Sequence, residues 1–244
     1  MAKEMYKVQI GDEVKLYEEG TTYEEIAREY QHKYEDDIVL VFADGKLQEL
    51  PRTCKHNCKL KFVTTSSAIG IETYRRSMCL MLVKAIYDVE GHENVRKVRI
   101  DFSVSKGYYC TVEGESAVTE AFLKKVKERM LQMVEACIPI KKRTIHTDEA
   151  IETFNRYGMY DKERLFRYRR VSKVNLYSIN AFEDYYYGYM VPNTSYLKYF
   201  ELYPYDEGFV IQMPEKKAPK TVPPFESQHQ LFRVLKESAE WGDM

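Results

Sequence analysis

Two cysteines and a histidine stand together in "CKHNC", residues 54–58, and these are side chains that bind zinc. A structural zinc site takes about four nitrogen or sulfur ligands, usually from two separated pairs. No second pair follows, and none of the five histidines lies three or four residues from another. The segment therefore favours a solvated turn between strands, and we expect no bound metal.

The glycines of the sequence do not form a phosphate-binding loop of the ordinary kinds. No two glycines have the spacing of G-x-G or of G-x-x-x-x-G-K-[ST], and Gly45-Lys46 falls inside an expected hairpin. The G-x-S-x-G turn of many hydrolases is also missing. We therefore expect neither a nucleotide-phosphate loop nor that hydrolase nucleophile within these residues.

A basic and aromatic segment could contact nucleic acid, with "KKR" at 141–143 as a second source of positive charge. Arginine and lysine bind phosphates, and tyrosine can stack on bases. The alternative is a solvated helix face whose apolar side chains point inward, and the sequence leaves both open. The candidate nucleic-acid residues are Arg164, Arg167, Tyr168, Arg169, Arg170 and Lys173.

Four tyrosines crowd the segment "EDYYYGYMVPNT", residues 183–194, around the single Gly188. They could be core side chains, a stacking platform for bases, or the remains of a site that has changed its chemistry. Alternation along a strand would send Tyr185 and Tyr187 to one face together. The elements that surround this segment have to decide between these interpretations.

The first 65 residues predict a small unit of their own. Short alternating strands flank the turn at Gly11-Asp12, a helix capped by Thr21 or Thr22 follows, and "IVLVF", "KLQEL" and "CKLKFV" predict three more strands. This order is typical of a β-grasp, ubiquitin-like unit. Residues 64–70 then form a plausible hinge.

The remaining chain alternates long helices with strands. Apolar spacing predicts a helix in "YRRSMCLMLVKAIYDV", and a second helix after the cap Thr119 that stops at Pro139. A hairpin turning at Lys106-Gly107 lies between them, and Thr147 caps a third helix that ends at Gly158. "KVNLYSI", "FEDYYYGYM", "YFELYPY" and "GFVIQM" predict the strands of one antiparallel sheet. A Pro-rich linker follows, and then a helix with Leu231, Val234, Leu235 and Trp241 on its apolar side.

Composition bounds the class of protein. The chain has 244 residues, 44% of them hydrophobic, and a formal net charge of −1, so no global field recruits nucleic acid or an anionic membrane. We expect neither a membrane span nor a signal peptide. The odd, scattered set of five cysteines is typical of reduced thiols, and we expect a cytoplasmic location.

The order of these elements, together with "IKKRTIHTDEAIETF" and a Val-Pro-Asn, resembles the N-terminal half of threonyl-tRNA synthetase, a TGS domain followed by an editing domain. The resemblance covers residues ~3 to ~212. That editing domain carries the metal-site motifs H-x-x-x-H and C-x-x-x-H. Here those positions are occupied by Arg76, Leu80, Tyr186 and Met190, which cannot together hold a zinc or activate a water. The resemblance therefore implies a refilled pocket and no catalytic residue.

Bacterial nucleoside kinases of the uridine-kinase and phosphoribulokinase type look similar to this altered version. In them a TGS domain and an editing-like domain precede a P-loop kinase domain. "YRRSMCLMLVKAIYD", "SKGYYC", "YGYMVPNTSYLKYFELYPYDEGF" and "WGDM" carry this resemblance. It implies that the catalytic part, with its ATP and Mg²⁺, belongs to a parent protein, and that this chain needs no cofactor.

These observations predict an α+β fold. It has a TGS-like β-grasp domain at 1–65, an editing-like (second additional) domain with an antiparallel sheet and long helices at 68–212, and a linker with a terminal helix at 213–244. The expected function is non-catalytic recognition of a nucleotide, nucleoside or RNA, which regulates an attached uridine or nucleoside kinase domain. The alternatives are a stand-alone tRNA- or RNA-binding module and a trans-editing aminoacyl-tRNA hydrolase.

The expected pocket residues are Arg76, Leu80, Lys106, Tyr108, Tyr186, Tyr189 and Met190. Arg76 either faces an anionic ligand or pairs with a buried carboxylate such as Asp184.

Overall fold

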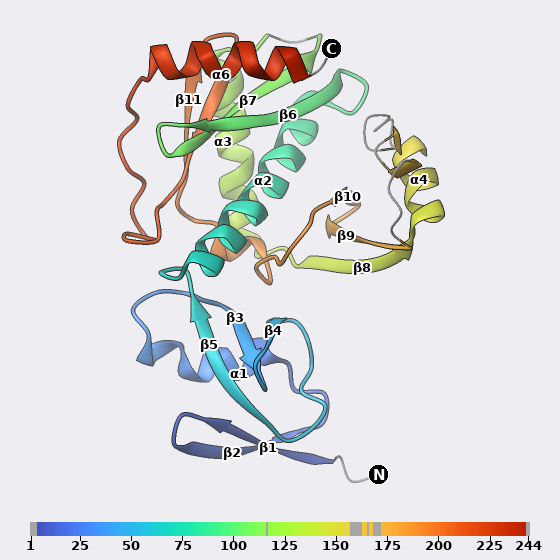
Figure 1. The fold of residues 1–244 in the computed structure, drawn as a ribbon, viewed down its shortest axis with the longest axis vertical. Coiled ribbons are helices and arrows are strands. Elements are labelled where there is room, and N and C mark those ends of the chain that lie inside the picture. The colour runs from blue at the N-terminus through green and yellow to red at the C-terminus, as the bar shows by residue number, and fades with distance from the viewer. Residues whose placement is uncertain (1–3, 116, 157–162, 165, 168–171, 243–244) are drawn as a thin grey trace.

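The computed structural model describes residues 4–115, 117–156, 163–164, 166–167 and 172–242 (Figure 1). Several sheets and helices alternate along the chain, which confirms the expected α+β class. Among the described residues, no helix combines the length and the apolar character needed to cross a bilayer.

A mixed five-stranded sheet with one helix forms the N-terminal unit, which we define as Met5–Thr64. Its elements are β1 (Met5–Ile10), β2 (Glu13–Glu18), α1 (Tyr23–Tyr30), β3 (Ile38–Ala43), β4 (Lys46–Glu49) and β5 (Cys58–Thr64). The sheet order is β2-β1-β5-β3-β4, with β1 and β5 parallel, as expected for a β-grasp. The predicted cap of α1 is confirmed: Thr22 accepts a hydrogen bond from the Glu25 backbone, and Glu25 accepts one in return.

Two long helices lie at the centre of the second unit, which we define as Ala68–Gln212. Helix α2 (Ala68–Glu90) follows β5 directly and is capped by Ser67, while α3 (Glu120–Glu135) is capped by Thr119 as predicted. They pack beside a four-stranded sheet of β6 (Val95–Val104), β7 (Gly107–Gly114), β11 (Glu201–Tyr205) and β12 (Gly208–Gln212), in the order β11-β12-β7-β6. The shared hydrophobic core holds α2 against α3 and the sheet.

A separate three-stranded sheet carries the segment that leads to the tyrosine run. It consists of β8 (Ile140–His146), β9 (Lys173–Ile179) and β10 (Phe182–Tyr185), with α4 (Thr147–Arg156) beside it. The prediction of one sheet for all the late strands is therefore wrong. Alternation identifies a strand but not its partner, and β10 ends at Tyr185, after which the chain leaves the sheet. The predicted end of the α4 helix at Gly158 lies outside the described residues.

The Pro-rich segment after β12 runs over the surface of both units, and we call residues 213–228 the strap. Figure 1 shows it descending beside the second unit and returning to α6 (His229–Gly242). Lys220 on the strap donates to the Glu35 carbonyl of the N-terminal unit. The predicted apolar side of the last helix is wrong in part: Phe232 is buried against the sheet, whereas Leu231 and Val234 are 47% and 62% exposed. The Trp241 side chain lies outside the described residues.

Candidate binding site between the two units

The loop that follows β10 is held against α2 by an arginine. Nη1 of Arg76 donates to the Tyr189 carbonyl at 2.9 Å. Gly188 has φ +117°, and a Cβ added there would lie 2.6 Å from Cζ of Arg76. Glycine is therefore required at this position both by its backbone conformation and by the close approach of the guanidinium. The arginine braces the loop from the helix.

Apolar side chains fill two more of the positions that carry metal ligands in the resembling editing domain. Leu80 is fully buried and Met190 is 2% exposed. The hydroxyl of Ser77 accepts from the Val191 backbone at 2.9 Å and lies 3.3 Å from the Met190 sulfur. Tyr186 is half-buried as a residue, and burial of its hydroxyl, then the nearby Asp184, raises its pKa well above the ordinary value. These groups pack the loop and supply no ionised nucleophile near neutral pH.

No group of three or more histidine, cysteine, aspartate or glutamate side chains could hold a metal within the part of the chain that the structure describes. In the "CKHNC" segment the sulfurs of Cys54 and Cys58 are 3.7 Å apart and buried. The exposed His56 ring lies 3.0 Å from the Asn57 carbonyl instead. Whether the purified protein carries zinc stays a prediction for elemental analysis.

One buried carboxylate of the N-terminal unit joins this loop to the rest of the molecule. Glu49, at the end of β4, is 6% exposed. Its Oε1 accepts from the Met190 backbone at 3.0 Å and lies 2.7 Å from the Tyr177 hydroxyl, while Oε2 accepts from Lys142 at 3.2 Å. Burial, followed by the Glu49 carboxylate, raises the pKa of Tyr177, which keeps the phenol protonated. A charge that is buried in this way is stable only while its partners stay in place.

Lys142 and Tyr177 each have a second contact within this network. The ammonium of Lys142 lies over the rings of Tyr177 and Tyr189, 5.2 and 5.9 Å from their centroids. The Tyr177 hydroxyl is also 2.6 Å from the Gly188 carbonyl, so its one proton has two acceptors. The network fixes the loop, β8 and β9 to the N-terminal unit.

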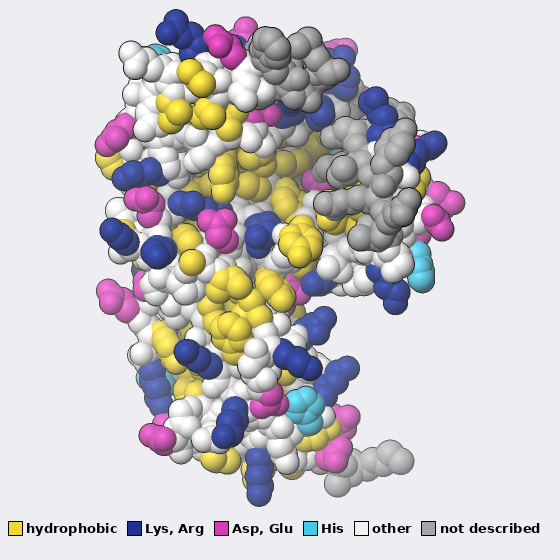
Figure 2. Space-filling view, in the orientation of Figure 1, with side chains coloured by type: hydrophobic (Ala, Val, Ile, Leu, Met, Phe, Trp, Pro, Cys, Tyr) yellow, Lys and Arg dark blue, Asp and Glu magenta, His cyan; other side chains and the backbone are white. Residues whose placement is uncertain are grey.

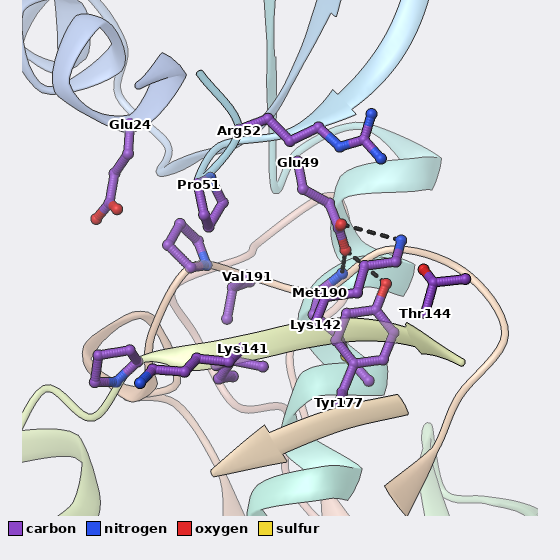
Figure 3. Close-up of a pocket in the computed structure, with 13 residues that line it drawn as sticks. Glu24, Glu49, Pro51, Arg52, Lys141, Lys142, Thr144, Tyr177, Met190 and Val191 are labelled. Carbon is purple, nitrogen blue, oxygen red and sulfur yellow. Dashed lines mark hydrogen bonds and ion pairs between the residues drawn. The ribbon is translucent and has the colours of Figure 1, made fainter. Parts of the chain in front are cut away.

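A cavity of about 510 Å³, here named the interdomain cavity, opens beside this network and is lined by both units (Figure 3). Basic side chains outnumber acidic ones in its lining, three to two. Glu49 and Lys142 neutralise each other, and Glu24 is paired with Arg28. The lining residues are Glu24, Glu49, Pro51, Arg52, Pro139, Ile140, Lys141, Lys142, Thr144, Tyr177, Met190, Val191 and Pro192.

Two cations on opposite units remain for a ligand at this cavity. Arg52 is exposed and, within the described residues, its guanidinium donates to the neutral Gln48, while Lys141 is exposed on β8. Figure 2 shows the surface notched between the three-stranded sheet and the N-terminal unit, with lysine and arginine side chains along the notch. The cavity can therefore accept an anionic or phosphate-bearing group from the solvent side.

The structure brings together only part of the predicted pocket. Tyr186, Tyr189 and Met190 lie with Arg76 at the loop, and Tyr108 packs against the same core. Lys106 instead lines another cavity beside Arg75 and pairs with Glu215 at 3.3 Å. For Arg76, the described hydrogen bond goes to the loop, while Asp184 accepts from the Tyr185 backbone.

The predicted nucleic-acid patch is described only in part. Arg164, Arg167 and Lys173 are exposed, and Arg167 is paired with Glu163, 2.7 Å from its Nε. Tyr168, Arg169 and Arg170 lie outside the described residues. The "KKR" stretch divides: Lys141 and Lys142 line the interdomain cavity, whereas Arg143 is held by Glu183 and Glu149.

Sequence reasoning missed Glu49, Arg52 and Tyr177 as residues of this site. The signal that the sequence offers for this region is the positive charge of the lysine pair at 141–142. Glu49 sits in a short hairpin strand where an acidic residue looks solvated, and its burial becomes visible only when the second unit covers β4.

No protein-family model matches the chain. Over 198 residues the chain is 30% identical to the threonine–tRNA ligase of Thermotoga petrophila and 31% identical to that of Thermotoga maritima. The enzyme of Exiguobacterium is 26% identical over 202 residues. These matches cover 80–81% of this chain and 30–31% of each ligase.

The match includes both units, because the residues after Thr64 make up less than 80% of the chain. The chain spans about 30% of the length of the curated relatives it matches. The comparisons therefore support a tRNA-synthetase-like pair of units.

Proposed function

We propose that this chain is a non-catalytic RNA-recognition region that binds the end of a tRNA at the interdomain cavity. The observation that carries the proposal is this cavity of about 510 Å³ between two units, each of which the match to threonine–tRNA ligases reaches. Its size lies within the usual range of about 300–1,000 Å³ for ligand sites. A single-stranded RNA end offers phosphates to Arg52 and Lys141.

Hydrolysis by these residues is disfavoured by what surrounds the carboxylates. A general base must be free to take a proton from water. Glu49 is already bonded to Lys142 and the Met190 backbone, and Glu24 is bonded to Arg28. The side chains of Arg76, Leu80 and Met190 brace or pack. The trans-editing alternative is therefore the weaker candidate.

The test is the salt dependence of tRNA binding, measured by fluorescence anisotropy with a labelled threonine tRNA transcript. If Lys141 contacts a phosphate, Lys141→Ala reduces the slope of log affinity against log salt by about 0.7–0.9. Lys124→Ala, an exposed lysine on α3 away from the cavity, is the matched control and leaves the slope unchanged. Absence of wild-type binding at low salt, or an equal effect of both variants, would reject the proposal.

A finer version of this function attaches the region to an ATP-dependent uridine or nucleoside kinase and gives it a regulatory role. It rests on the resemblance of the sequence alone, since the curated relatives found are threonine–tRNA ligases. A G-x-x-x-x-G-K-[ST] motif in the gene beyond the codon for Met244 would support it. The cytoplasmic location and the independence from cofactors stay predictions.

A further inference from the structure

A second cavity, of about 500 Å³, lies where the start of α2, the β6–β7 turn and the strap meet, and we call it the strap cavity. It is separate from the loop braced by Arg76. Four basic side chains face two acidic ones, which leaves an excess of two positive charges. The lining residues are Ala68, Ile71, Glu72, Arg75, Lys106, Glu215, Lys216 and Lys217.

Arg75 is the innermost cation of this cavity, with 19% of its side chain exposed. One Nη donates to the Pro214 carbonyl at 3.0 Å, and the other lies 3.6 Å from Glu72. Its Nε is buried and has no hydrogen-bond partner among the described residues. Burial raises the pKa of Tyr108, and the charge and hydrogen bond of Arg75 oppose that rise, so the chain itself places a phenol oxygen beside this guanidinium. Arg75 therefore gives the cavity its positive charge, and the lysines are the groups that a ligand can reach.

Three lysines surround the guanidinium from two different segments. Lys106 lies on the β6–β7 turn, where its φ is +66°. Its Nζ forms an ion pair with Glu215 at 3.3 Å, and half of its side chain is exposed. Lys216 and Lys217 follow on the strap, both exposed, and neither has an ion pair within the described part of the chain. Charges left unpaired in a concave site attract an anion most strongly.

We propose that the strap cavity binds a small phosphate-bearing ligand, of the class of nucleoside phosphates. Lysines supply point charges to phosphate oxygens, and the charge of Arg75 adds to theirs from the buried side of the cavity. The cavity has room for more than a bare phosphate, and the wall of Ala68 and Ile71 is apolar enough to contact a sugar or base. The neighbouring Arg76 is excluded from this role because it is bound to the loop on another side of α2.

Such a ligand would also fasten the strap. Arg75 and Lys106 belong to the second unit, while Lys216 and Lys217 belong to the strap, so one anion would bridge both segments. The strap in turn reaches the N-terminal unit through Lys220. Binding should therefore protect the lysines of the strap from trypsin.

The experiment measures thermal shift and calorimetric affinity at constant ionic strength. The probes are inorganic phosphate, pyrophosphate, uridine monophosphate and adenosine monophosphate. Binding raises the melting temperature as ligand concentration exceeds Kd. The double change Lys216→Ala, Lys217→Ala lowers the affinity about tenfold or more, which corresponds to about 1.4 kcal/mol. Lys124→Ala, Lys125→Ala removes the same charge from the exposed face of α3 and leaves the affinity unchanged.

These measurements, together with tRNA binding by the same variants, also distinguish whether the strap cavity binds a free nucleotide or the phosphates of an RNA. If the strap lysines serve RNA, the double strap variant weakens tRNA binding as much as pyrophosphate binding, and mononucleotides cause no shift beyond that of phosphate. If they serve a free nucleotide, tRNA binding is unchanged. No shift with any probe at about 10 mM, which would mean a Kd weaker than the millimolar range, or equal losses in the α3 control, would overturn the proposal.

Discussion

The interdomain cavity and the strap cavity are nearly equal in volume, and both are lined by an excess of basic side chains. They differ in how many of these basic side chains form ion pairs within the protein. At the first, the buried pair of Glu49 and Lys142 joins two units, and Arg52 and Lys141 remain for a ligand. At the second, Lys216 and Lys217 are exposed and make no ion pair within the described residues. The difference teaches that charge in a cavity indicates a ligand only where the chain has not already paired it.

The largest effect expected from this comparison is the loss of Glu49. Glu49→Ala lowers the free energy of unfolding by about 3 kcal/mol or more, because Lys142 and the Met190 backbone lose a buried acceptor. Urea unfolding measures it. Glu207→Ala is the control, since that carboxylate is 82% exposed in its pair with Lys236 and should change stability by about 0.5 kcal/mol at most. Similar losses in both variants would show that Glu49 is not the joint between the units.

A change at Gly188 tests the contact by which Arg76 holds the loop after β10. Gly188→Ala costs about 2 kcal/mol, because an L residue at φ +117° is strained and its Cβ displaces the Arg76 guanidinium. Gly45→Ala, at φ +77° with open space around it, isolates the backbone cost of about 1 kcal/mol. In an Arg76→Ala background the cost of Gly188→Ala should fall to its backbone part, which at φ +117° is at least that of Gly45→Ala at φ +77°. If Gly188→Ala keeps its full cost of about 2 kcal/mol in that background, a clash of the new Cβ with the guanidinium is not its cause.

The pH dependence of stability tests the burial of the Cys79 thiol on α2. Burial raises the pKa of the Cys79 thiol to about 12, against an ordinary pKa of about 8.5. The unfolded chain therefore loses this proton first. The contribution of Cys79 is fully present below about pH 8.5 and falls as pH rises toward 12, by about 1 kcal/mol between pH 8 and 9.5.

Wild type and Cys79→Ala are to be compared by urea unfolding at these two pH values. The variant should lose less stability than the wild type over that interval, whatever its stability at pH 8. Parallel curves would mean that the thiol is not protected from ionisation in the folded protein.

The smallest effect is expected at the strap cavity without its ligand. Lys106→Ala should change stability by about 0.5 kcal/mol or less, because its pair with Glu215 is exposed. The same variant should weaken pyrophosphate binding severalfold. A stability loss as large as that of Glu49→Ala would show that the cation is structural, and the contrast between the two cavities would disappear.

Local features of this fold could be predicted from the sequence, because local residues determine them. Thr22 and Thr119 cap helices by hydrogen bonds within three residues, and the turns at Gly11 and at Lys106 need only their own backbone. The β-grasp order and the altered residues Arg76 and Met190 also followed from the sequence. The β-grasp order follows from the succession of strand and helix patterns, whereas the altered positions are implied by the resemblance to threonyl-tRNA synthetase.

Features set by distant partners could not be predicted. Whether β10 pairs with β9 or joins the sheet of β12 depends on packing across the whole unit. Phe232, rather than Leu231, became buried because aromatic side chains of β6 and β7 offered it a surface. The site residues are harder to predict than the fold. Arg75 and Arg76 are adjacent in sequence, yet Arg75 contacts the strap and Arg76 contacts the loop after β10.

The carboxylate of Glu49 has a consequence for the order of folding. Its partners Tyr177 and Met190 are 128 and 141 residues away along the chain, whereas its strand pairs with β3 only a few residues before it. Closing so long a segment costs chain entropy before any contact repays it. The N-terminal unit is thus expected to acquire its structure first and to present Glu49 before the second unit arrives. In stopped-flow measurements, Glu49→Ala should then accelerate unfolding while leaving the refolding rate nearly unchanged.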